Sequence, residues 1–219
     1  MATVQQITEF ETSISWIRIQ KWVARSRSWI ALLILAPFLV TSLLSAPWAF
    51  KGSWGACIFD EIGLLLFFLG AGMRWWSTLY IGGRKTSALV TDGPYSICRN
   101  PLYFGSFCMG LAVAAFLESL TFSIGLLLAT CIYLGATVSV EERRLLDRFG
   151  DEFTQYCTKV PRFFPAFHCF KTPSMIEVNT NGLAAESLRA VRWIWLPILC
   201  VLVAQLRAQP FWPCMLRLP

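Results

Sequence analysis

The chain has 219 residues, of which 56% are hydrophobic and only 15% are charged, and its formal net charge is +6. This composition is too apolar for an ordinary soluble domain. The basic residues flank apolar runs and form no single patch, which argues against nucleic-acid binding. The composition therefore predicts an all-α integral membrane protein. The eight cysteines include no CxxC pair and His168 is the single histidine, so neither a metal site nor a disulfide framework is predicted.

The first 27 residues form a basic segment, which fits either an amphipathic helix on the membrane surface or a positively charged flank of the first span. Five apolar runs are predicted to be transmembrane helices. They cover residues 28–50, 56–81, 101–117, 120–140 and 188–208. The third and fourth runs are short for full crossings, so they are predicted to pair as a helical hairpin over 101–140. A polar connector, 171–187, is expected before the last run.

A polar, turn-forming stretch enters the third apolar run. Residues 89–105 (LVTDGPYSICRNPLYFG) contain an Asp-Gly-Pro turn, two tyrosines, an arginine and an asparagine. Such a stretch beside an apolar helix is costly unless it faces a cavity or a ligand. A second polar block, Glu141-Glu142-Arg143-Arg144, follows the fourth run. Apolar residues at helical spacing from Leu145 to Phe153 predict that an amphipathic helix emerges from that run and ends near Val160. The hairpin should bring both blocks together, and the basic flanks place them, with the N-terminus, on the cytoplasmic side.

The charged residues of these blocks indicate a ligand site. Two adjacent glutamates at the end of a membrane helix oppose the helix dipole, which suggests a cationic partner. That partner would be the amino group or sulfonium of a ligand, or Arg99 across the hairpin. Arg99 is the predicted catalytic residue, because it could pair with a carboxylate or orient an acceptor oxygen. Arg74, beside two tryptophans, is expected to extend to the membrane interface, with a ligand contact as the alternative.

The segments GPYSICRNPLYFG and VEERRLLDRFGDEFTQYCTKVPRFFP resemble the isoprenylcysteine carboxyl methyltransferase family and its bacterial relatives, in a wider group with the phospholipid methyltransferases. The resemblance covers about residues 74–165. It implies a methyltransferase core over 28–170, an additional C-terminal helix within 171–219, and a cytoplasmic pocket for S-adenosylmethionine. Cofactor contacts carried over from the family are Ser87, Ala88, Leu89, Val90, Tyr95, Asn100, Pro101, Leu102, Tyr103, Glu141 and Glu142.

Two positions depart from the family pattern. Many members have histidine where Asn100 stands, and an asparagine cannot act as a base, so Asn100 can only bind or orient. Thr137 stands where the prenylcysteine enzymes have a substrate-binding arginine, a role that Arg99 or Arg74 could take.

The resemblance implies methyl transfer to a lipophilic acceptor that arrives from the bilayer. It favours O-methylation of an isoprenylcysteine-type carboxylate, with a phospholipid amine or a thiol as alternative acceptors. Two rival classes remain open: a membrane sterol or enone reductase that uses NADPH, and a non-catalytic membrane scaffold.

Overall fold

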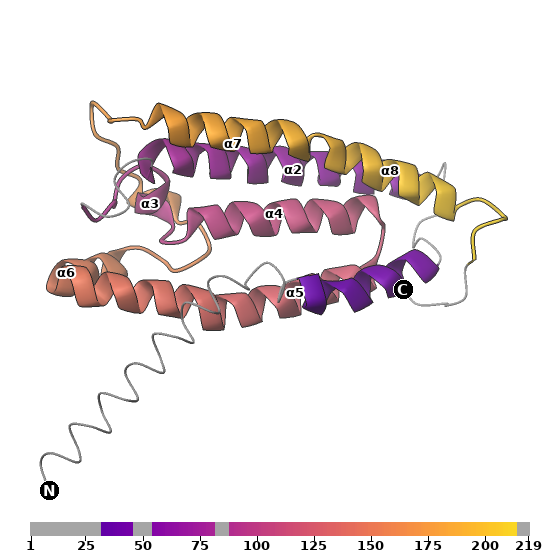
Figure 1. The fold of residues 1–219 in the computed structure, drawn as a ribbon, viewed down its shortest axis with the longest axis horizontal. Coiled ribbons are helices and arrows are strands. Elements are labelled where there is room, and N and C mark those ends of the chain that lie inside the picture. Colours follow the sequence, from indigo (N-terminus) through magenta and orange to yellow (C-terminus); the bar gives the residue numbers. More distant parts are fainter. Residues whose placement is uncertain (1–31, 46–53, 82–87, 214–219) are drawn as a thin grey trace, which may run out of the picture.

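The computed structural model describes residues 32–45, 54–81 and 88–213, and this part of the chain consists of helices, turns and loops without a β-strand (Figure 1). The predicted contact Ser87 and the basic segment 1–27 lie outside the described residues. Helical segments occur at all five predicted apolar runs. Two of them, Trp54–Ile81 and Thr180–Arg207, are long and apolar enough to cross a membrane, and three are shorter: Leu32–Leu44, Pro101–Phe116 and Leu120–Tyr133. That every run crosses the bilayer stays a prediction.

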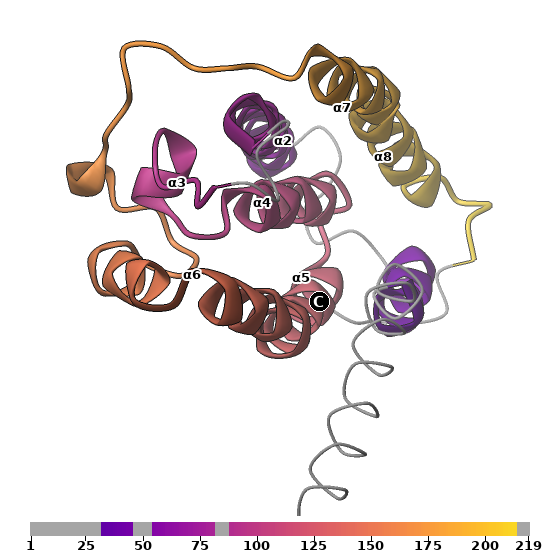
Figure 2. The ribbon, with the colours of Figure 1, turned by 60° about the vertical axis from the view of Figure 1, so that its left-hand side comes forward.

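The centre of the fold is the contact between α2 (Trp54–Ile81) and α4 (Pro101–Phe116), and α4 lies between α2 and the α5–α6 helix (Figures 1 and 2). The two backbones touch at Gly70 and Gly105. A Cβ on Gly70 would lie 2.5 Å from the carbonyl oxygen of Gly105, and one on Gly105 would lie 2.7 Å from the carbonyl of Gly70. Small residues allow this close approach. Gly72, in contrast, faces no neighbour within 4 Å.

The hairpin continues into the amphipathic helix that was predicted to emerge from the fourth run. Ser119 caps α5 (Leu120–Tyr133) by accepting a hydrogen bond from the Phe122 amide at 3.2 Å. The helix then runs through a π-helical turn, η1 (Leu134–Val138), into α6 (Ser139–Lys159). Glu141 and Glu142 therefore lie in the first turn of α6, inside a continuous helix. The expected conflict with a helix C-terminus was wrong, because the chain stays helical past residue 140.

The last helix also begins earlier than predicted. The expected connector 171–187 contains the first turns of α7 (Thr180–Trp193), because the Asn179 side chain caps the helix by accepting from the Gly182 amide at 3.1 Å. α7 packs beside α2, and α8 (Trp195–Arg207) follows it (Figure 1). At the end of α8, the buried Arg207 guanidinium donates to the carbonyl of Ser45 at 2.8 Å and to the carbonyl of Leu117. This arginine ties the hairpin turn to the end of the Leu32–Leu44 helix.

Candidate functional site

The polar stretch before α4 folds into a tight turn and one short helix, α3 (Pro94–Ile97). Gly93 precedes α3 with φ 60° and ψ −127°, a conformation that side chains oppose. Its backbone lies against the ring of Tyr80, where a Cβ would be 2.4 Å from the ring carbons. The turn buries Tyr95 and Ile97.

The loop that follows α6 pairs with this stretch along its length. Three backbone hydrogen bonds join them: Arg99 N to Pro161 O at 2.9 Å, Ala166 N to Ile97 O at 2.8 Å, and Gly93 N to Lys171 O at 2.7 Å. The hydroxyl of Tyr156, on α6, donates to the Tyr95 carbonyl at 2.6 Å. The thiol of Cys98 donates to the Phe163 carbonyl at 2.9 Å, and burial raises the pKa of Cys98 to about 12. The two polar blocks therefore meet, as the sequence predicted.

Glu142 is the centre of a charged network at this junction. Its carboxylate lies 3.6 Å from Nε of Arg99 and 3.0 Å from Nε of Arg162, and it accepts a hydrogen bond from Nδ2 of Asn100 at 3.3 Å. Asn100 also donates to the Arg162 carbonyl at 3.0 Å. Arg99 is thus a cationic partner of Glu142, as predicted, and Asn100 orients the carboxylate. On the neighbouring position, Glu141 accepts from the Tyr103 hydroxyl at 2.8 Å.

All the described site residues predicted from the sequence line one cavity of about 1050 Å³. They are Ala88, Leu89, Val90, Tyr95, Arg99, Asn100, Pro101, Leu102, Tyr103, Glu141 and Glu142. Thr137 is buried and is not among the lining residues. Small-molecule sites have volumes of about 300–1,000 Å³, so this cavity has room for a nucleoside-sized ligand and part of a second molecule.

Further lining residues were missed by the sequence reasoning. They come mainly from α2, α4, α5 and α7, and they include Thr78, Ser106, Tyr133, Glu186 and Arg189. Arg74, for which a ligand contact was the alternative prediction, also lines the cavity. Glu186 lies in the segment 171–187 that the sequence predicts as a connector, and Arg189 lies near the start of the predicted fifth run. The available signal was Asn179, an N-cap residue, ahead of a run in which Glu186 and Arg189 stand three positions apart.

Tyr95 presents an unsatisfied polar atom at this cavity. Its side chain is only 7% exposed, and its hydroxyl has no hydrogen-bond partner among the described residues. Burial raises the pKa of Tyr95, and the nearby Cys98 and Glu141 raise it further, while Arg74 opposes them. The phenol is therefore neutral at physiological pH. A buried hydroxyl without a partner costs about 1–3 kcal/mol, which a ligand atom at this position would recover.

Comparisons with known proteins point to methyl transfer. A family described as phospholipid methyltransferase matches residues 59–152. The cobalt-zinc-cadmium resistance protein CzcN of Cupriavidus metallidurans is 32% identical over 165 residues, which are 75% of this chain and 76% of that protein. The protein-S-isoprenylcysteine O-methyltransferase of Schizosaccharomyces pombe is 33% identical over 81 residues, 37% of this chain and 34% of that protein.

A shorter similarity extends to a thiol methyltransferase. The methanethiol S-methyltransferase 1 of Bradyrhizobium diazoefficiens is 35% identical over 74 residues, 32% of this chain and 24% of that protein. No solved structure matches the chain.

Proposed function

Because the chain belongs to the isoprenylcysteine O-methyltransferase family, within the phospholipid methyltransferase group, we propose that it transfers a methyl group from S-adenosylmethionine to a lipophilic acceptor. One observation carries the proposal: the described family-type contacts line a single cavity, in which the buried Tyr95 hydroxyl has no partner among the described residues. We further propose that the protein crosses the membrane several times, with its N-terminus and this cavity on the cytoplasmic side.

The polar groups of the cavity suit this cofactor. The carboxylates of Glu141 and Glu142 would hold its amino group, and the Tyr95 hydroxyl would bind a polar atom of the cofactor. The backbone of residues 88–90 would hydrogen-bond to the edge of the adenine, and the ring of Tyr103 would stack on its face. When bound, S-adenosylmethionine would supply an electrophilic methyl group to a lone pair of the acceptor, with S-adenosylhomocysteine as the leaving group.

The chain's own residues then have three tasks in the reaction. They bind both molecules, align them and exclude water, which raises the reactivity of an anionic acceptor. Arg99 is held by Glu142 at the cavity wall, where its guanidinium would orient an acceptor oxygen. Asn100 donates through its amide and cannot remove a proton. An acceptor that is already deprotonated at neutral pH therefore fits this site best.

A carboxylate of the isoprenylcysteine type is the acceptor that we favour, and a thiol is the alternative that the Bradyrhizobium relative supports. A phospholipid amine is the acceptor suggested by the family description. The apolar wall formed by Leu35, Phe107 and Leu126 suits a lipid chain. CzcN is named for resistance to cobalt, zinc and cadmium. The described residues hold no group of three or more His, Cys, Asp or Glu side chains that could bind a metal ion.

Purified protein in detergent, incubated with radiolabelled S-adenosylmethionine and an extract of membrane lipids, should transfer label to an extractable product. A Tyr95→Ala, Glu141→Ala double variant should lose both transfer and cofactor binding. Full activity in that variant would refute the site. The reductase alternative is tested in parallel: S-adenosylmethionine, and not NADPH, should raise the thermal stability of the protein.

A further inference from the structure

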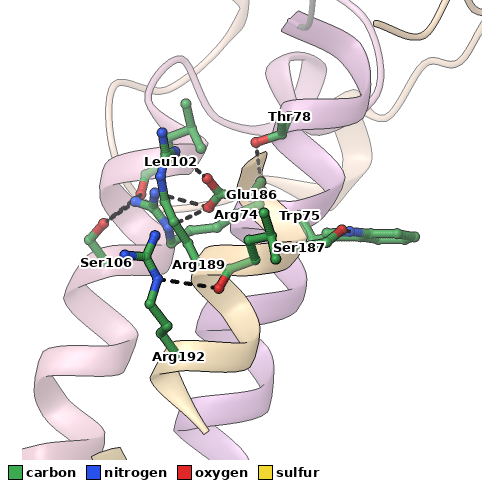
Figure 3. Close-up of polar contacts among 10 residues, drawn as sticks. Arg74, Trp75, Thr78, Leu102, Ser106, Glu186, Ser187, Arg189 and Arg192 are labelled. Atoms are coloured by element: carbon green, nitrogen blue, oxygen red, sulfur yellow. Dashed lines mark hydrogen bonds and ion pairs between the residues drawn. The ribbon is translucent and has the colours of Figure 1, made fainter. Parts of the chain in front are cut away.

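A cluster of two arginines and one glutamate lies on the part of the cavity wall that α2 and α7 form (Figure 3). Glu186 is 2% exposed, and its Oε1 lies 3.0 Å from both Nε and NH2 of Arg74, on α2. Its Oε2 accepts from NH1 of Arg189, one turn further along α7, at 2.6 Å. The cluster of Arg74, Glu186 and Arg189 thus holds two guanidinium groups with one carboxylate and keeps a net positive charge.

The two arginines differ in the donors that remain available. Arg74 is 17% exposed and also donates through NH1 to the Ser106 hydroxyl at 2.6 Å, and its Cζ lies 4.7 Å from the ring centroid of Trp193. It is thus held on several sides. The Arg189 side chain is 51% exposed, and the contact from its Nη1 to Glu186 is its one side-chain hydrogen bond among the described residues. The guanidinium group of Arg189 therefore has further N–H donors available for a ligand in the cavity.

Charge across the whole cavity points the same way. The described lining residues include four arginines, at 74, 99, 144 and 189, and three glutamates, at 141, 142 and 186, an excess of one positive charge. S-adenosylmethionine itself carries a net positive charge, since its sulfonium and ammonium outweigh its carboxylate. With that cofactor in place, a cationic second ligand is repelled and an anionic one is attracted.

We propose that Arg189 binds the acceptor together with Arg99, and that it recognises an oxyanion, a carboxylate or a phosphate, on an amphiphilic acceptor. Glu186 holds the Arg189 guanidinium at the cavity wall. This assignment rests on the proposed function, and it places acceptor recognition on α7, beyond the family match at residues 59–152. The position that carries an arginine in the prenylcysteine enzymes by resemblance, Thr137, is buried here and does not line the cavity.

Binding measured without turnover tests the assignment. Purified full-length protein in nonionic micelles is titrated with laurate, dodecyl phosphate and dodecanol, which share a chain length and differ in the head group. We expect at least one anionic probe to bind about tenfold more tightly than dodecanol, corresponding to about 1.4 kcal/mol. That preference should fall as salt is added. Whether laurate or dodecyl phosphate gains more distinguishes a carboxylate from a phosphate acceptor.

Arg189→Gln should remove most of the preference for the anionic probe and leave dodecanol binding unchanged. Arg192→Gln is the matched control, because Arg192 is exposed on the same helix, does not line the cavity and carries the same charge. Arg189→Lys should keep part of the preference, since it retains the charge and loses the planar fork. Equal binding of all three probes by the wild type, or an intact preference in Arg189→Gln, would overturn the assignment.

The same preparations also separate this inference from the proposed function. If S-adenosylmethionine raises the thermal stability but no anionic probe is preferred, the Arg189 assignment fails and the proposed function stands. If an Arg189-dependent anionic preference appears without any cofactor effect, the methyltransferase proposal fails and the anion site stands.

Discussion

The hydroxyl of Tyr156 donates a hydrogen bond to the backbone carbonyl of Tyr95 at 2.6 Å, across 61 positions of sequence. This bond joins α6 to the turn that carries the unsatisfied Tyr95 hydroxyl. Burial raises the pKa of Tyr156, so it remains a donor at physiological pH. The Tyr95 ring is thus held in place through its own main chain, and its hydroxyl is left for a ligand.

Tyr156→Phe should destabilise the protein by about 1–3 kcal/mol, because it leaves the buried Tyr95 carbonyl without this donor. It should also weaken S-adenosylmethionine binding, since the turn becomes less fixed. Chemical denaturation in detergent measures the first effect and titration calorimetry the second. Tyr80→Phe is the control, because Tyr80 loses only an exposed bond to Thr172. Equal stability of the two variants would contradict the assigned role of Tyr156.

Gly93→Ala should destabilise the turn for two separate reasons. Its φ of 60° with ψ of −127° disfavours any side chain, and the new Cβ would clash with the Tyr80 ring at 2.4 Å. Gly72→Ala, with no neighbour within 4 Å, should instead raise stability, by up to about 1 kcal/mol, through helix propensity. A Gly93→Ala, Tyr80→Ala double variant should recover only the steric part. Thermal denaturation of the three variants would show these differences, and a neutral Gly93→Ala would refute the turn geometry.

Alkaline pH should destabilise the protein partly through Cys98. The pKa of this thiol rises from 9.0 to about 12 on burial, so the unfolded chain loses the proton first as the pH increases. The unfolded state then binds fewer protons, and the free energy of unfolding falls between pH 9 and 12. Cys98→Ala removes this dependence. Its denaturation midpoint should therefore fall less steeply from pH 8 to pH 10 than that of the wild type, and parallel slopes would contradict this account.

Much of the candidate site follows from local sequence. The turn before α4 and the Glu141-Glu142 pair are compact motifs, and the short apolar runs imply the hairpin that joins them. The structure brings all the described residues of this set to one cavity. Their role in binding S-adenosylmethionine stays a prediction.

Long-range pairing explains what sequence reasoning missed. Arg74 was expected to extend to the membrane interface, but it pairs with Glu186, 112 positions later. The mixture of apolar and polar residues around Glu186 does not indicate that this helix packs on α2. The amphipathic helix after the fourth run, in contrast, was predicted correctly from the helical spacing of its apolar residues. α6 is stabilised there by Phe153, Tyr156 and Val160, which pack with Leu89 of the site.

The most direct test of the methyltransferase site is the titration of S-adenosylmethionine into wild-type protein and Tyr95→Phe. The wild type should bind the cofactor, and Tyr95→Phe should bind it about tenfold more weakly, a loss of about 1.4 kcal/mol. Because the lost hydroxyl has no partner among the described residues, the free energy of unfolding without ligand should stay equal or rise. No cofactor binding by the wild type, or equal affinity in both proteins, would contradict the proposed site.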